Sequence, residues 1–230
     1  MPAESARHLP QRPPEVMRIW DLPTRLFHWL LVALFAFSWW SAENREMEWH
    51  YRSGLTLLAL LLFRLLWGLF GGSTARFAWF VTSPAEVLLY LRGRKDTDRI
   101  GHNPLGGYSV VAMLLMLFGQ VTTGLLATDV DGLESGPLSF LVDFDQGRQA
   151  AELHEACFTV LLVLIGIHVL AVLFYLLVRK RNLVRAMVTG YDGQVSKAGQ
   201  GVVKAPAWRF ALAAAAAGAG AWATAHGFWL

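Results

Sequence analysis

The chain has 230 residues, of which 55% are hydrophobic and only 16% are charged. A soluble domain usually carries about 25% charged residues, so this composition favours a polytopic membrane protein of one domain. The formal net charge of +3 is small, and we expect no nucleic-acid partner. The single cysteine, Cys157, excludes an intrachain disulfide, and no CxxCH motif for covalent haem attachment occurs.

The chain begins with a polar, Pro-rich stretch, residues 1–16, which we expect to be a disordered cytoplasmic tail. Apolar segments of membrane-spanning length then follow at 24–40, 50–70, 107–127 and 151–178. We therefore expect one transmembrane domain over 17–193 and a linker within 194–230. The last apolar segment, 207–229, is rich in Ala and Gly, which drive insertion weakly. It is either a fifth span or an interfacial helix.

The charges of the loops predict the orientation of these spans. Positive residues gather before the first span, between the second and third, and after the fourth. They are Arg7, Arg12, Arg18 and Arg25, then Arg76, Arg92, Arg94, Lys95 and Arg99, then Arg179, Lys180, Arg181 and Arg185. Because loops rich in Lys and Arg stay in the cytoplasm, the N-terminus is expected inside. Trp39, Trp40 and Trp49 then mark the outer membrane surface, and Trp67 marks the inner end of the second span.

Four histidines fall at two depths of the membrane in this orientation. His28 and His168 share the inner half, whereas His50 and His154 share the outer edge. His154 and His168 lie on one helix, and their spacing places them on nearly the same side, about 21 Å apart along the axis. Ionisable residues within spans are costly and are functional by default. We therefore predict two sites, one for each pair.

Two imidazoles from different helices suit haem iron. Zinc usually takes four ligands, and no third ligand is evident at the inner level. Haem iron needs only two axial ligands, and a flat apolar ring fits a gap between membrane helices. Arg64, at the inner level, either pairs with a haem propionate or extends to the headgroups. The glycines that would allow close approach of a flat ring or of a neighbouring helix are Gly54, Gly119, Gly124 and Gly166.

Three stretches of the chain resemble the bacterial cytochrome b561 family, which is grouped with the cytochrome b subunits of nickel–iron hydrogenases. They are RIWDLPTRLFHW at 18–29, GHNPLGGYSVVAMLLMLFGQVTTGL at 101–125, and the LHEACF and IGIHVLAVLFY segments of the fourth span. The resemblance covers most of the chain. It implies an all-α membrane protein, a four-helix transmembrane bundle that binds two b-type haems by bis-histidine ligation. By this resemblance, the axial ligands are His28, His50, His154 and His168.

The resemblance also implies a function in a respiratory chain at the bacterial inner membrane. Electrons would pass between the quinone pool, with ubiquinone as the substrate, and a periplasmic partner such as cytochrome c or a hydrogenase-like protein. A stand-alone enzyme, such as a quinone-coupled superoxide oxidase, is the alternative, and a non-redox membrane scaffold is the second. The acidic outer loop, with Asp129, Asp131, Glu134, Asp143 and Asp145, disfavours an anionic substrate and suits a basic protein. We also expect the protein to contact membrane lipid. The sequence does not decide whether it forms a homodimer.

The inner loop carries two local helix-start signals. Ser83-Pro84 before AEVLLYLRG predicts a short amphipathic helix that ends at Gly93. Asn103-Pro104 predicts the start of the third span. We interpret the adjacent His102 as part of that turn, in preference to a proton carrier beside a quinone.

Overall fold

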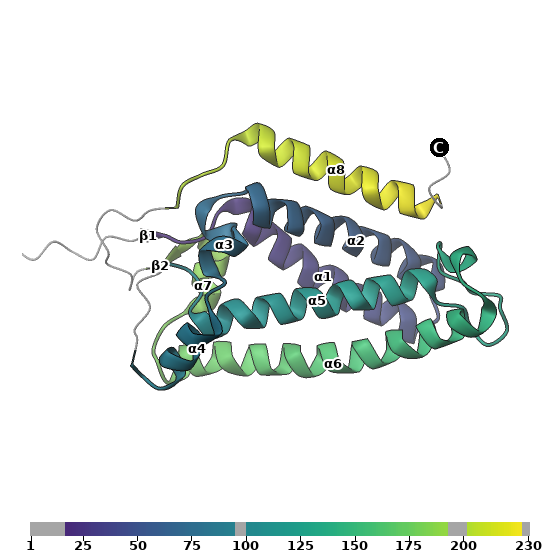
Figure 1. The fold of residues 1–230 in the computed structure, drawn as a ribbon, viewed down its shortest axis with the longest axis horizontal. Helices are drawn as coiled ribbons and strands as arrows, with labels where there is room; N and C mark the ends of the chain where they lie inside the picture. Colours follow the sequence, from purple (N-terminus) through teal and green to yellow (C-terminus); the bar gives the residue numbers. More distant parts are fainter. Residues whose placement is uncertain (1–16, 95–99, 193–201, 227–230) are drawn as a thin grey trace, which may run out of the picture.

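The computed structural model describes residues 17–94, 100–192 and 202–226. Four helices in these ranges are long and apolar enough to cross a membrane. They are α1 (Leu22–Glu43), α2 (Met47–Phe70), α5 (Pro104–Leu126) and α6 (Phe144–Leu177). α1 packs along α2, α5 packs along α6, and α2 also contacts α5, which gives the elongated bundle of Figure 1. The predicted four-helix bundle is confirmed, while the predicted tail 1–16 and most of the linker lie outside the described residues.

Side-chain caps explain where α1, α5 and α6 begin. Asp21 Oδ1 accepts a hydrogen bond from the Thr24 amide at 3.0 Å at the start of α1. α6 begins at Phe144 rather than at 151, because Asp143 and Gln146 form a capping box that starts the helix among polar residues. Its 34 residues extend over about 51 Å, which exceeds the roughly 30 Å of a hydrocarbon core. This helix is therefore long enough to project beyond the membrane.

Short elements close one end of the bundle, which we call the sheet end. β1 (Met17–Arg18) pairs antiparallel with β2 (Tyr191–Asp192), although the sequence predicted no strand. The other short elements at this end are η1 (Ser73–Ala75), α3 (Phe77–Phe80), α4 (Pro84–Leu91) and α7 (Leu183–Thr189). The predicted short helix is confirmed as α4, since Ser83 caps it and Gly93 follows it with φ +65°.

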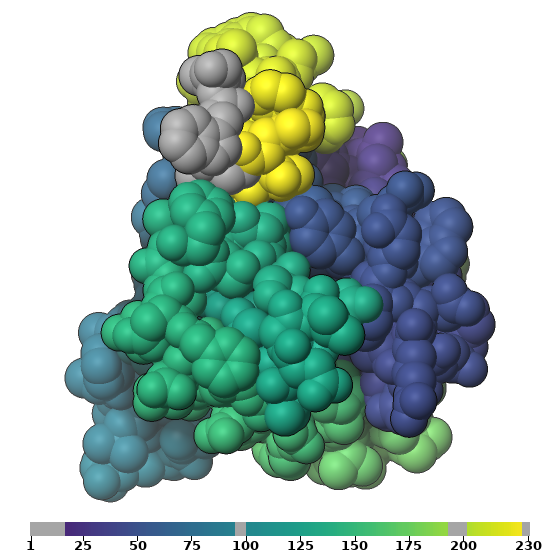
Figure 2. Space-filling view, turned by 90° about the vertical axis from the view of Figure 1, so that its right-hand side faces the viewer, coloured from purple at the N-terminus to yellow at the C-terminus, as the bar shows by residue number. Residues whose placement is uncertain are grey.

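The opposite end, which we call the hairpin end, carries the α1–α2 turn and the loop between α5 and α6. This loop contains η2 (Ser139–Leu141) and is closed by an antiparallel bridge between Thr128 and Ser135. Figure 2 looks onto this end and shows the green loop beside the blue α1–α2 turn. The two ends therefore differ in construction, because one is built from many short elements and the other from two connections.

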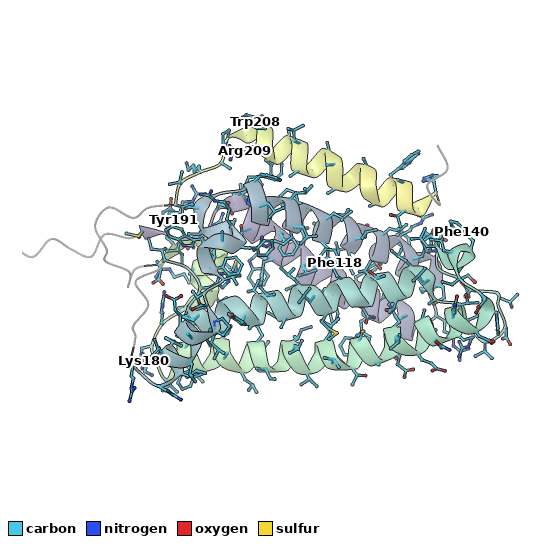
Figure 3. All side chains as sticks on the ribbon, viewed as in Figure 1. Phe118, Phe140, Lys180, Tyr191, Trp208 and Arg209 are labelled. Carbon is cyan, nitrogen blue, oxygen red and sulfur yellow. The ribbon has the colours of Figure 1, made fainter. Side chains whose placement is uncertain are left out.

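α8 (Ala207–Ala225) lies along α2 on the side away from α6 (Figure 1). Ala213, Ala217 and Ala221 recur every four residues and form its buried face. At its start, Arg209 Nη1 donates to the Phe70 carbonyl at 3.2 Å, and Figure 3 labels Arg209 at that point. α8 is not among the four described helices that combine the required length and hydropathy. A fifth span therefore stays a prediction.

Trp67 anchors α2 to the start of α1. Its side chain is only 3% exposed, and its Nε1 donates to Asp21 Oδ2 at 3.0 Å. Trp67 thus lies near the end of α2, as predicted, but its ring faces the protein interior and not a membrane surface. By contrast, Trp39, Trp40 and Trp49 at the hairpin end are 42%, 53% and 48% exposed. Their exposure is what an interfacial position requires.

Candidate functional site

His50 on α2 and His154 on α6 bring their rings together near the hairpin end. Their ring centroids lie 6.0 Å apart, and the ring planes are nearly perpendicular at 85°. Imidazole nitrogen binds a transition metal at about 2 Å, so two rings on opposite sides of one metal ion have centroids roughly 6 Å apart. The predicted pair is therefore adjacent, at a separation that fits a shared metal ion.

Both rings of this hairpin-end pair are anchored by main-chain carbonyl groups. His50 Nδ1 lies 2.9 Å from the carbonyl oxygen of Ser38 on α1. His154 Nδ1 lies 2.8 Å from the carbonyl oxygen of Gln120 on α5. A ring that donates from Nδ1 keeps the lone pair of Nε2 for a metal. Sequence reasoning missed Ser38 and Gln120, because a main-chain acceptor has no residue-type signature.

The His154 ring also explains one of the singled-out glycines. A Cβ atom at Gly124 would lie 2.7 Å from His154 Cε1, which is too close for any side chain without a shift of the ring. Gly119 approaches Cys157 Sγ, with 3.7 Å from an added Cβ. Gly54 and Gly166 have no atom within 4 Å of an added Cβ, so both border open space. Gly166 is exposed on the outside of the bundle, so the open space beside it is not an internal cavity.

His28 on α1 and His168 on α6 form the second pair, toward the sheet end. They lie close enough to interact electrostatically. Nδ1 of His28 is buried and has no hydrogen-bond partner among the described residues. The His28 ring instead packs edge-on against Trp29, with centroids 4.9 Å apart. Buried polar atoms are rarely left unpaired. A metal bound to Nε2 of His28 would still leave its Nδ1 without a partner.

Arg64 lies in the interior at the sheet end, with 3% of its surface exposed. Its Nη1 donates to the Ala75 carbonyl at 3.2 Å, and its guanidinium lies 4.9 Å from the centroid of Phe77. The charge of Asp21 is near enough to act on it. The alternative in which Arg64 extends to the headgroups is therefore wrong, whereas pairing with a propionate stays a prediction.

His102 joins the sheet-end group from the loop before α5. Its ring centroid lies 4.7 Å from that of Trp20 and 4.8 Å from that of Phe80. Burial, followed by the charges of Arg64 and His168, lowers the pKa of His102 to about 3, so the ring is neutral near pH 7. The cap of α5 comes from Asn103, whose Oδ1 accepts from the Gly106 amide. His102 is thus a packing residue between two aromatic rings.

The four histidines come in pairs drawn from different helices. Over 17–94, 100–192 and 202–226, no three or more His, Cys, Asp or Glu side chains gather in a way that could hold a metal ion. A porphyrin supplies four equatorial ligands and asks the protein for two axial ones. The hairpin-end pair, with its spacing and its anchored Nδ1 atoms, fits that demand once the Gln120 amide, 2.9 Å from His154 Nε2, moves aside.

Comparison with known proteins agrees with this geometry. A family model described as prokaryotic cytochrome b561 matches residues 19–190, a range that holds the four apolar helices and both histidine pairs. Neither the comparison with curated proteins nor the comparison with solved structures gave a match. The family is one of membrane b-type cytochromes that act in electron transfer, and membership implies the binding of haem b. Since the match covers well over half of its length, the chain is a multi-pass membrane protein that belongs to the prokaryotic cytochrome b561 family.

Proposed function

We propose that this protein is a dihaem electron carrier that connects the quinone pool with a protein partner across the bilayer. The observation that supports it most is the adjacency of His50 and His154, on different helices, with both Nδ1 atoms held by main-chain carbonyls. His168 provides a second level, because it follows His154 on α6 by about 21 Å along the helix axis. Two levels on one helix suit transfer along the membrane normal.

Each pair has a defined role in this proposal. His50 and His154 would be the axial ligands at the hairpin end, and His28 and His168 would be those at the sheet end. Haem iron changes between the ferric and ferrous states, which is the one-electron chemistry that the group supplies when bound. Arg64 would neutralise a carboxylate of the sheet-end group, since a buried guanidinium favours an anionic partner. The surrounding apolar helices would exclude water.

The charges of the two ends support an orientation. The sheet end carries positive residues, which favours its placement in the cytoplasm. They include Arg76, Arg92, Arg94, Arg179, Lys180, Arg181 and Arg185, and Figure 3 labels Lys180 beyond the end of α6. The sheet-end pair would then meet quinone from the inner leaflet, and the N-terminus would lie inside.

The hairpin end carries the acidic loop, which supports a basic protein as the partner on the periplasmic side. Its carboxylates are Asp129, Asp131, Glu134, Asp143 and Asp145. A negative field concentrates positive proteins and repels superoxide and other anions. A basic cytochrome c or a hydrogenase-like subunit fits this field better than a small anionic substrate does.

The test is to reconstitute the purified protein in liposomes and to follow the haem absorbance. We expect a reduced ubiquinone analogue to reduce the haem and a basic cytochrome c to reoxidise it, at a rate that falls as salt rises. An acidic cytochrome c is the matched control and should react more slowly. Haem that is neither reduced by quinol nor reoxidised by quinone would contradict the proposal, and faster reduction by superoxide than by quinol would favour the stand-alone enzyme.

A further inference from the structure

We propose that the main chain at Ser38 and Gln120 selects the ligating tautomer of the hairpin-end histidines, and that Ser41 and the Gln120 side chain modulate this selection as positioning residues. The assignment rests on the proposed function, because it presumes that His50 and His154 bind iron. It deepens that function by adding residues that act on the iron through the histidines.

The two carbonyl groups occupy equivalent positions in the two helix pairs. Ser38 on α1 accepts from His50 on α2, and Gln120 on α5 accepts from His154 on α6. In both cases the acceptor lies on the helix that packs along the histidine-bearing helix. Each ring is therefore oriented by a contact within its own helical hairpin. A donating Nδ1 leaves Nε2 as the metal-binding atom of both rings.

A hydroxyl group also lies within hydrogen-bond distance of each of these carbonyl oxygens. Ser41 Oγ donates to the Ser38 carbonyl at 2.8 Å, and Thr123 Oγ1 lies 3.0 Å from the Gln120 carbonyl. A carbonyl oxygen has two lone pairs, so a second donor weakens its attraction for the imidazole N–H. Ser41 is fully buried, and it reaches His50 only through this carbonyl. It is thus placed to set the strength of the His50 hydrogen bond without touching the ring.

The Gln120 side chain acts on the same tautomer from the other side of the ring. Its amide Nε2 lies 2.9 Å from His154 Nε2. An amide nitrogen only donates, so His154 Nε2 is the acceptor and the proton resides on Nδ1. Iron needs the same lone pair, so this amide would have to move away from Nε2 when haem binds. The carbonyl and the side chain of one residue therefore favour the same form of the ring. Stronger donation from Nδ1 makes a ring a better electron donor to iron and stabilises the ferric state.

The first experiment measures the midpoint potentials of both haems in the haem-loaded full chain, by redox titration with optical and EPR detection. We expect Ser41→Ala to lower the potential of the hairpin-end haem and to leave the sheet-end haem in place. Thr159→Val is the matched control, because Thr159 donates a similar bond to the exposed Glu155 carbonyl, which no histidine uses. An unchanged potential in Ser41→Ala, or an equal shift in the control, would overturn the assignment.

A second pair of variants tests the side chain and does not depend on Ser41. Gln120→Glu replaces a donor with an acceptor and favours the opposite tautomer of His154, so the hairpin-end haem content should fall. Gln120→Met removes the donor without adding an acceptor and should lose less haem than Gln120→Glu. Equal losses would show that Gln120 matters only for its shape. Wild-type protein without haem would sink the proposed function and this assignment together, whereas two haems with equal losses would sink only the assignment.

Discussion

The two histidine pairs differ in what holds their rings. At the hairpin end, His50 and His154 are tied to main-chain carbonyls of neighbouring helices. At the sheet end, neither His28 nor His168 hydrogen-bonds to a described residue, and the neighbourhood contains the charge of Arg64 and the neutral ring of His102. One pair is thus oriented by hydrogen bonds and the other by packing. Substitutions should act through geometry at the hairpin end and through charge and packing at the sheet end.

Removal of one histidine from each pair is expected to have the largest effect. His168→Ala should lose the sheet-end haem and keep most of the hairpin-end haem, while His154→Ala should do the reverse. The reason is that each haem depends on both of its axial ligands. A pyridine haemochrome count with EPR of the ferric state would separate the two. If one substitution removed neither haem, the ligand assignment would be wrong.

Gly124→Ala should damage the hairpin end selectively. The added Cβ would lie 2.7 Å from His154 Cε1, so the ring must shift relative to its carbonyl anchor. Overpacking of this kind typically costs about 1–3 kcal/mol, and part of the hairpin-end haem should be lost with it. Gly218→Ala is the control, since an added Cβ there meets nothing within 4 Å. Thermal unfolding and haem content in detergent would both report the difference, and equal behaviour of the two variants would contradict it.

Asp21→Asn tests the polar anchor of the sheet end. In the wild type, Asp21 caps α1 through Oδ1 and accepts from Trp67 Nε1 through Oδ2 at 3.0 Å. The amide of Asn has one oxygen, so it can keep the cap but cannot also accept from Trp67. A hydrogen bond to a charged group contributes about 1.5–3 kcal/mol, so the unfolding temperature should fall measurably. Ser83→Ala, which removes the cap of the exposed helix α4, should have the smaller effect. A reversed order of the two would mean that the Asp21–Trp67 bond is not an anchor.

At neutral pH the smallest expected effect is that of His102, which grows only as the solution becomes acid. Its pKa is about 3 in the folded chain, against 6.5 for the ordinary side chain. Below pH 6.5 the unfolded chain binds a proton at this ring that the folded chain does not. The stability that the neutral ring contributes is therefore complete above pH 6.5 and is lost as the pH falls toward 3. The slope is at most about 1.4 kcal/mol per pH unit. His102→Phe should therefore flatten the fall in unfolding temperature between pH 7 and pH 5, and an unchanged slope would refute the buried neutral ring.

Sequence reasoning located the features that depend on composition and helical period. The apolar runs predicted the four long helices, and the spacing of His154 and His168 placed both rings on one side of α6. The loop charges then suggested that His50 and His154 share one level. The adjacency of the two rings follows from these two observations, because the direction of each helix and the spacing of its residues fix their depth in the bundle.

The missed features depend on contacts between distant segments or on the main chain. β1 and β2 have two residues each, which is too short for an alternating pattern. The burial of Trp67 depends on its bond to Asp21, which precedes α1 and is distant in the sequence. Ser38 and Gln120 act through carbonyl groups that every residue possesses. Only the packing of α1 on α2 and of α5 on α6 selects them.

The most direct measurement is the dithionite-reduced minus oxidised spectrum of the purified protein, with a pyridine haemochrome count per chain. Two b-type haems per chain would agree with both histidine pairs as ligand sets. One haem would mean that one pair is not a site, and the variants His154→Ala and His168→Ala would identify which. A preparation without b-type haem, after growth with ample haem supply, would contradict the electron-transfer account.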